Sequence, residues 1–253
     1  MGWALLAGHV HNAAFVNFDV DRRVLEPLVP AGTELDTWQG RALVSLVAFE
    51  MTDNRLLGVP LPFARAYDQI NLRTYVRRRV PDGTWRAGVL FLRELVPVPA
   101  LVAGARLLYR ERYERQPVSA RVRPPDPAGP RPGRAVYRWR RHDRVHRMAI
   151  DFAPPLVLPA EGSLEHFLAD RHWGYVAPVD GDTREYRVDH RPWRIWSAEA
   201  ARLSPTAAAS FGERFERALA RDATSAFVAE GSLMELHRPR PIGPLDQSAR
   251  NAL

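Results

Sequence analysis

One short stretch of the sequence combines residue types that can bind an organic anion. Residues 68–76 read Asp-Gln-Ile-Asn-Leu-Arg-Thr-Tyr-Val, in which polar and apolar side chains alternate. Successive side chains of a β-strand point to opposite faces, so one face would carry Gln69, Asn71, Arg73 and Tyr75. In a barrel interior, the Arg73 guanidinium can hold a carboxylate through two parallel hydrogen bonds, while the amides and the phenol orient the ligand. The alternative is a half-buried strand whose polar face meets solvent.

Several reaction types lack the residues that they need. The chain contains no cysteine and no lysine, which excludes thiolate nucleophiles, disulfides and lysine Schiff bases. No Gly-x-Ser-x-Gly elbow, phosphate-binding glycine loop or Gly-x-Gly-x-x-Gly motif occurs. Three histidine pairs lack convincing metal-ligand spacing: His9 with His11, His142 with His146, and His166 with His172. We therefore predict neither a metal ion nor a cofactor.

The charged residues indicate no particular macromolecular partner. All 36 basic side chains are arginines, against 29 acidic residues, for a net charge of +7. The arginines are spread along the chain, whereas nucleic-acid sites concentrate positive charge on one face or segment. An arginine-rich protein that docks acidic partners or nucleic acid therefore stays a secondary hypothesis. A coding bias toward arginine, alanine and proline would produce the same charge without a partner.

The sequence also lacks signals for export or membrane insertion. Its first residues carry no basic region ahead of an apolar stretch, and no apolar run approaches the ~20 residues of a membrane-spanning helix. We expect a cytoplasmic protein that binds neither nucleic acid nor a membrane. Nothing in the sequence sets the oligomeric state, and a homo-oligomer is compatible with it.

The elements that must position these residues are mostly strands. Two-residue periodicity predicts strands over residues 13–20, 33–38, 41–51, 67–77, 85–94, 117–123, 134–141, 144–152, 183–190 and 232–238. Gln39-Gly40 and Asp82-Gly83 are typical hairpin turns. Helices are expected after the cap residue Asp21 and over 99–108, 163–171 and 205–220. The fold class is therefore mainly antiparallel β, a barrel or a sandwich, with a few peripheral α-helices.

One domain is expected over residues 1–240, followed by a poorly ordered tail over 241–253. The stretch 124–132 is rich in proline and cannot occupy a central strand. It is too short for a convincing interdomain linker, and we interpret it as a long hairpin loop.

The order of motifs resembles a bacterial family of unknown function, the YqjF-like proteins, grouped with the acetoacetate decarboxylase superfamily. The resemblance covers roughly residues 10–240. It rests on residues 71–76, on residues 161–168 leading to Arg171-His172-Trp173, and on His190-Arg191-Pro192-Trp193. It implies a cone-like antiparallel β-barrel with peripheral helices and an interior pocket, in agreement with the strand pattern.

The resemblance also implies a lysine that this chain lacks. In acetoacetate decarboxylases, a segment similar to residues 93–95 leads to a proline and two lysines, the first of which forms a Schiff base. Here Pro99 is followed by Ala100 and Leu101. Arginine cannot substitute for the missing amine, because its guanidinium stays protonated at physiological pH.

The resemblance thus leaves a pocket without the Schiff base. Arg73 or Arg93 would bind an anion, and Glu94 would accept a proton or pair with an arginine. The preferred hypothesis is a protein that binds a small organic acid or keto compound in the barrel, with a non-covalent proton transfer if it is an enzyme. A ligand-binding or regulatory module without chemistry is the alternative.

Overall fold

The computed structural model describes residues 4–126, 131–141, 143–176 and 182–242. Its strands are β1 Leu6–Asp19, β2 Glu34–Leu35, β3 Leu43–Leu56, β4 Val59–Pro60, β5 Ala66–Arg79, β6 Trp85–Val96, β7 Tyr113–Arg115, β8 Val118–Arg123, β9 Gly133–Arg141, β10 Arg144–Val157, β11 Trp173–Val176, β12 Arg184–His190, β13 Ile195–Leu203, β14 Ser225–Ala229, β15 Leu233–Leu236 and β16 Arg240–Pro241. The α-helices are α1 Arg22–Leu25, α2 Pro99–Leu108, α3 Leu164–Ala169 and α4 Glu213–Leu219, with 3₁₀ turns η1 Glu26–Leu28, η2 Pro62–Ala64 and η3 Ala209–Phe211.

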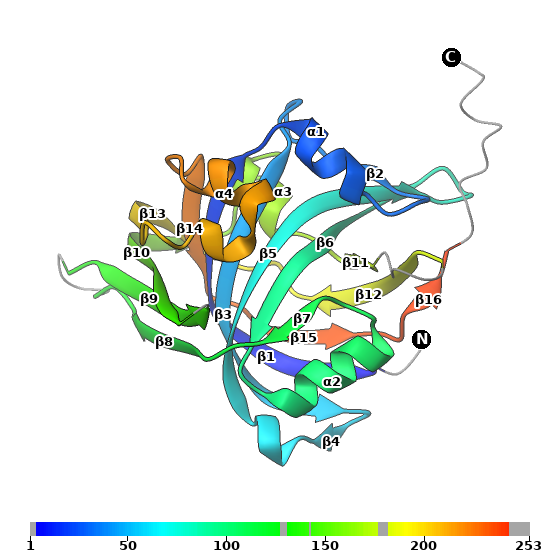
Figure 1. The fold of residues 1–253 in the computed structure, drawn as a ribbon, viewed down its shortest axis with the longest axis horizontal. Helices are drawn as coiled ribbons and strands as arrows, with labels where there is room; N and C mark the ends of the chain where they lie inside the picture. The colour runs from blue at the N-terminus through cyan, green and yellow to red at the C-terminus, as the bar shows by residue number, and fades with distance from the viewer. Residues whose placement is uncertain (1–3, 127–130, 142, 177–181, 243–253) are drawn as a thin grey trace.

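The described strands close into a seven-stranded barrel in the order β1-β3-β5-β6-β11-β12-β15, with β15 returning to β1 (Figure 1). Most neighbours are antiparallel, as predicted, but β11 runs parallel to β6. Turn signals reveal hairpins between consecutive strands, whereas a parallel pair needs a long connection that leaves no local signal. Here that connection contains α2, β7, β8, β9, β10 and α3. The barrel is consequently mixed.

Strand β1 belongs to both the barrel and a second sheet. It pairs with β3 from Leu6 to Asp19 on one side. On the other side, its first residues pair with β15 and its later residues, from Ala13 to Asn17, pair with β14. From β14 the sheet continues through β13, β10 and β9 to β8. The barrel and the second sheet are therefore continuous through one strand.

Two of the three apolar cores of the described chain lie on opposite faces of the barrel strands. One contains residues such as Ile70 and Leu72 and packs the outer face against the second sheet and the Phe211 and Phe215 side chains. The other contains Tyr75 and forms the barrel interior, which α3 covers through residues that include Leu168. The interior face of β5 is the face that the sequence predicted to be polar.

Most predicted elements are present, with shifted ends. Helix α2 has the predicted bounds, and Asp21 and Ser163 cap α1 and α3 by accepting hydrogen bonds from Arg23 and His166 backbone amides. The single helix predicted over 205–220 is wrong, because Gly212 adopts a φ of 99° between η3 and α4. Strands β11, β13 and β14 were not predicted.

Two other predictions concern segments at the limits of the described chain. Pairing of Arg184 in β12 with Pro241 in β16 extends regular structure to the start of the predicted tail, and residues 243–253 lie outside the described residues. Residues 127–130 of the predicted hairpin loop also lie outside them. Within the described chain, no helix is long and apolar enough to cross a bilayer.

The parallel pairing of β6 with β11 depends on a glycine. A Cβ atom at Gly88 would lie 2.4 Å from the Trp173 carbonyl oxygen and 2.7 Å from a Tyr175 ring carbon. We predict that Gly88→Ala lowers the free energy of unfolding by about 1–3 kcal/mol, because backbone must move to admit the methyl group. Urea denaturation measures this change.

Gly104 in α2 provides the matched control. A Cβ atom there would meet no atom within 4 Å. Gly104→Ala should therefore raise stability by up to about 1 kcal/mol, since alanine favours the helix. Equal stability of the two alanine variants would contradict the close contact at Gly88.

Candidate functional site

A cavity of about 80 Å³ lies inside the barrel, large enough for several water molecules. Apolar side chains such as Phe49, Met51 and Phe91 form much of its wall. The polar and charged side chains in the wall come from the four strands β5, β6, β7 and β12 and from the α3–β11 segment: Tyr67, Gln69, Arg73, Glu94, Tyr113, Arg171, Tyr186 and His190. Few polar groups in a mostly apolar wall are typical of small-molecule sites.

Strand β5 presents its polar residues to the interior rather than to solvent. Gln69, Asn71 and Tyr75 are 5%, 2% and 0% exposed, which excludes the solvent-facing alternative for this strand. Gln69 and Arg73 line the cavity. Asn71 is buried between them without lining it, and its Oδ1 atom has no hydrogen-bond partner in the described chain. Tyr75 lies deeper, where its hydroxyl is 2.5 Å from the Ser45 hydroxyl.

A register shift decides which β6 side chains face the cavity. Leu72 pairs with Arg93, but the next residue, Arg73, pairs with Phe91. This bulge inserts one extra residue in β6, so Glu94 and Phe91 share the interior face although three positions separate them. Arg93 faces away from the cavity, and its guanidinium pairs with Glu114 of β7. Of the two predicted residues, the structure therefore brings only Glu94 to the cavity.

The Arg73 side chain carries a charge that no acid balances within 4 Å in the described chain. One of its terminal nitrogens donates a 2.7 Å hydrogen bond to the Leu168 carbonyl oxygen. Its Nε atom is buried without a hydrogen-bond partner. The guanidinium carbon lies 4.8 Å from the centre of the Phe15 ring and 5.5 Å from that of Tyr75. Aromatic faces stabilise a cation only in part, so Arg73 retains capacity for an anion.

Arg171 shows the contrasting arrangement in the same wall. Its Nη1 lies 2.5 Å from Asp36 Oδ2, and its guanidinium stacks over the Phe167 ring at 3.9 Å. Both side chains of the ion pair are buried. Burial lowers the pKa of Arg171, and the carboxylate of Asp36 opposes that shift. Its charge is thus balanced within the protein, whereas that of Arg73 is not.

The surroundings of the Glu94 carboxyl group favour its neutral form. Its Oε1 accepts a 3.0 Å hydrogen bond from Gln69, and its Oε2 is buried without a hydrogen bond of ordinary length. Burial, and next the charge of Glu111, raise the pKa of Glu94 well above its usual value, although Tyr113 and Gln69 lower it part of the way. The raised pKa favours the protonated form of Glu94, which can donate a hydrogen bond or its proton.

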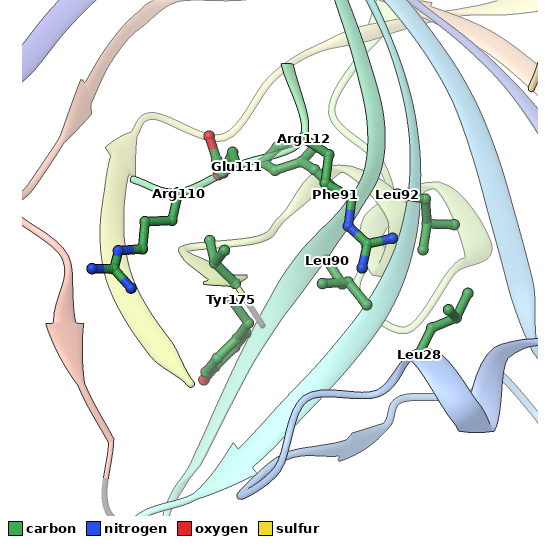
Figure 2. A pocket seen from close by; sticks show the side chains of 9 residues that line it. Leu28, Leu90, Phe91, Leu92, Arg110, Glu111, Arg112 and Tyr175 are labelled. Atoms are coloured by element: carbon green, nitrogen blue, oxygen red, sulfur yellow. The ribbon is translucent and has the colours of Figure 1, made fainter. Parts of the chain in front are cut away.

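Glu111 completes a buried carboxyl pair that the sequence did not reveal. Burial raises its pKa to about 7, although the hydrogen bond from the Tyr186 hydroxyl opposes part of the shift. Its neighbours Arg110 and Arg112 are exposed and extend to opposite sides of the segment between α2 and β7 (Figure 2). In the sequence, a glutamate between two arginines indicates a solvated segment. The crevice in Figure 2 has a volume of about 20 Å³, which is too small for an organic ligand.

Other cavity residues had a signal in the sequence that we did not interpret as functional. Arg171, His190 and Trp193 all lie in motifs that carry the family resemblance. The His190 ring stacks between those of His172 and Trp193, with centroid distances of 4.7 and 4.9 Å. Burial lowers the pKa of His190. His190 and Trp193 form a wall of the cavity beside Arg171.

A comparison with protein families supports the resemblance that the sequence motifs indicate. Residues 9–232 match DUF2071, described as an uncharacterized conserved protein. The chain belongs to the DUF2071 family. Uncharacterized protein YqjF of Bacillus subtilis (strain 168) is 28% identical to it over 196 residues, which are 75% of this chain and 74% of YqjF. The predicted resemblance is therefore confirmed.

Solved structures relate this DUF2071 protein to acetoacetate decarboxylase-like barrels. Acetoacetate decarboxylase from Legionella pneumophila has a TM-score of 0.65 at 12% identity, over 97% of this chain and 91% of that one. The enduracididine biosynthesis enzyme MppR, complexed with pyruvate, has a TM-score of 0.66 at 14% identity, over 96% and 93% of the two chains. At these identities the likeness shows the fold, which confirms the predicted class.

The buried carboxyl pair makes stability depend on pH. Because the folded-state pKa of Glu111 lies at about 7 rather than 4.5, the folded protein binds more protons than the unfolded chain between these values. The free energy of unfolding attributable to Glu111 therefore falls, by up to about 3 kcal/mol, as pH rises through this window. We predict that Glu111→Gln removes this loss, so that its stability relative to the unmodified protein increases from pH 5 to pH 8.

Urea denaturation at several pH values measures the difference. Glu213→Gln, which changes an exposed residue at the start of α4, is the control and should show a constant difference. A Glu111→Gln variant whose relative stability is the same at pH 5 and pH 8 would contradict the raised pKa.

Proposed function

We propose that the barrel cavity binds a small organic acid or keto acid, whose carboxylate lies on the Arg73 guanidinium. The observation that carries this proposal is the charge of Arg73, which is unbalanced by any acid within 4 Å in the described chain. Nearby Arg171 has its own acid, Asp36. Arg73 is partly buried, with its Nε atom shielded from solvent, and a cation in such a position without a counterion is destabilised, so an anionic ligand would supply the counterion.

Glu94 supports a keto compound as the ligand. Its neutral carboxyl group faces the same cavity and can donate a hydrogen bond, or its proton, to a carbonyl oxygen. An ionised carboxylate there would instead repel the anion. We infer that Arg73 fixes the acid group, that Glu94 meets the carbonyl oxygen, and that apolar side chains such as Phe91 exclude water around them.

The related barrels support this ligand class. MppR has a similar fold and is described in complex with pyruvate, a small keto acid. The partner that we propose is accordingly a small anion rather than nucleic acid or a membrane. Any chemistry on it would be a proton transfer that needs no lysine, since the chain contains none.

The Arg73→Met variant tests the anion site. We expect it to bind pyruvate and acetoacetate roughly 10- to 100-fold more weakly than the unmodified protein, because a hydrogen bond to a charged group contributes about 1.5–3 kcal/mol. The variant without ligand should be at least as stable, since it no longer buries an unbalanced charge. Isothermal titration calorimetry and thermal melting provide the two readouts.

Arg77→Met is the matched control on the same strand. The Arg77 side chain is 40% exposed and pairs with Glu34 outside the cavity. Its substitution should leave ligand affinity unchanged. Equal affinities of the Arg73 and Arg77 variants for both acids would overturn the proposed site.

The absence of lysine predicts a second result. Incubation with acetoacetate followed by borohydride should add no mass to any internal residue, because reduction traps only an imine formed on an amine. Intact-mass and peptide mass spectrometry measure the adduct, and an acetoacetate decarboxylase treated in parallel is the positive control. A stable adduct on an internal residue of this chain would refute the lysine-independent proposal.

A further inference from the structure

A second, apolar groove lies between α2 and the end of the barrel. In Figure 1, α2 lies in front of β1 and below β7 and β15. The groove below it has a volume of about 110 Å³ and includes Leu101, Gly104 and Leu108 of α2 in its wall. Among its described lining residues, Glu111 is the only acid, and no arginine or histidine is present. This groove differs from the cavity in having no cation.

The groove and the cavity share part of their walls. Leu6, Tyr67, Tyr113 and Leu236 line both. Glu94 lies on the cavity side of this boundary and Glu111 on the groove side, and the charge of Glu111 acts on the pKa of Glu94. The two spaces are therefore adjacent at the carboxyl pair, and a ligand held in the cavity has an apolar space directly beyond its carbonyl end.

The outer rim of the groove exposes apolar side chains to water. Phe63 is 56% exposed and Leu108 is 40% exposed. The first residues of α2, Ala100 and Leu101, are also apolar and line the groove. Removing such surface from water is favourable, so an apolar occupant gains affinity with each methylene that it buries.

We propose that the ligand is an amphipathic carboxylate whose acid group binds Arg73 and whose aliphatic tail passes Tyr67 and Tyr113 into the groove under α2. This proposal rests on the proposed function, because Arg73 fixes the acid group. The wall that the two spaces share, formed by Leu6, Tyr67, Tyr113 and Leu236, favours a ligand tail over a second copy of the chain as the occupant. The ligand class is thus a straight-chain α-keto acid longer than pyruvate.

Gly104→Leu tests the tail site by filling the groove. The added side chain enters open space, since a Cβ atom at Gly104 meets nothing within 4 Å, and leucine favours a helix more than glycine does. Ala103→Leu is the matched control, because Ala103 is exposed on α2 and does not line the groove. Both variants should retain the thermal stability of the unmodified protein.

The experiment measures affinities of straight-chain α-keto acids from pyruvate to α-ketooctanoate by calorimetry. In the unmodified protein and in Ala103→Leu, affinity should rise about 3- to 4-fold for each methylene buried. In Gly104→Leu, pyruvate should bind as before, and the gain with chain length should disappear. Sedimentation of all three proteins should show the same oligomeric state.

Several results would overturn the inference, and they are distinguishable from failure of the anion site. Short acids that bind through Arg73 with no gain from longer chains would exclude the groove and leave the anion site intact. A gain that survives Gly104→Leu would exclude this groove as the tail site. Affinities that Arg73→Met leaves unchanged, together with a gain that Gly104→Leu abolishes, would refute the anion site instead. A change of oligomeric state in Gly104→Leu without a change in affinity would assign the groove to a second copy.

Discussion

The architecture depends on the hydrogen bonding of β1. This strand pairs along its whole length with β3, and its other edge is divided between β15 and β14. The pairing with β15 closes the barrel, and the pairing with β14 starts the second sheet. Closure removes free strand edges and shields the interior from water. Every polar side chain on the interior face of β5 is consequently placed in a medium that disfavours charge.

Acids and arginines respond differently to that medium, and the site follows from the difference. A buried carboxyl group can take up a proton, and burial raises the pKa values of Glu94 and Glu111. An arginine cannot lose its charge at any ordinary pH, so it needs an acid or another anion. Arg171 forms an ion pair with Asp36, whereas Arg73 donates a hydrogen bond to a carbonyl oxygen and contacts two aromatic rings. The interior thus combines a neutral acid with an unbalanced cation.

The sequence could predict the features that depend on local periodicity. Alternation over 67–77 places Gln69, Arg73 and Tyr75 on one face, and closure of the barrel turns that face inward. It could not predict the bulge opposite Arg73, because a register shift depends on the partner strand as well as on the strand itself. For that reason Arg93 and Glu94 were both candidates, although only Glu94 faces the cavity.

The parts that were missed depend on contacts between distant segments. Strands β11 and β14 have four and five residues, too few for a periodic signal, and each forms by pairing with strands far along the chain. Glu111 is buried only because Tyr186 and Glu94 approach it from other strands. No pattern around residue 111 reports that approach.

Anion binding in the cavity is coupled to protonation of Glu94. A negative charge placed on Arg73 shares the cavity with Glu94 and raises the pKa of that carboxyl group, so the bound protein holds more protons than the free protein at pH values near that pKa. Binding then consumes protons from the solution. The observed heat of binding varies with the ionisation enthalpy of the buffer, and the complex becomes tighter as the medium is acidified toward that pKa.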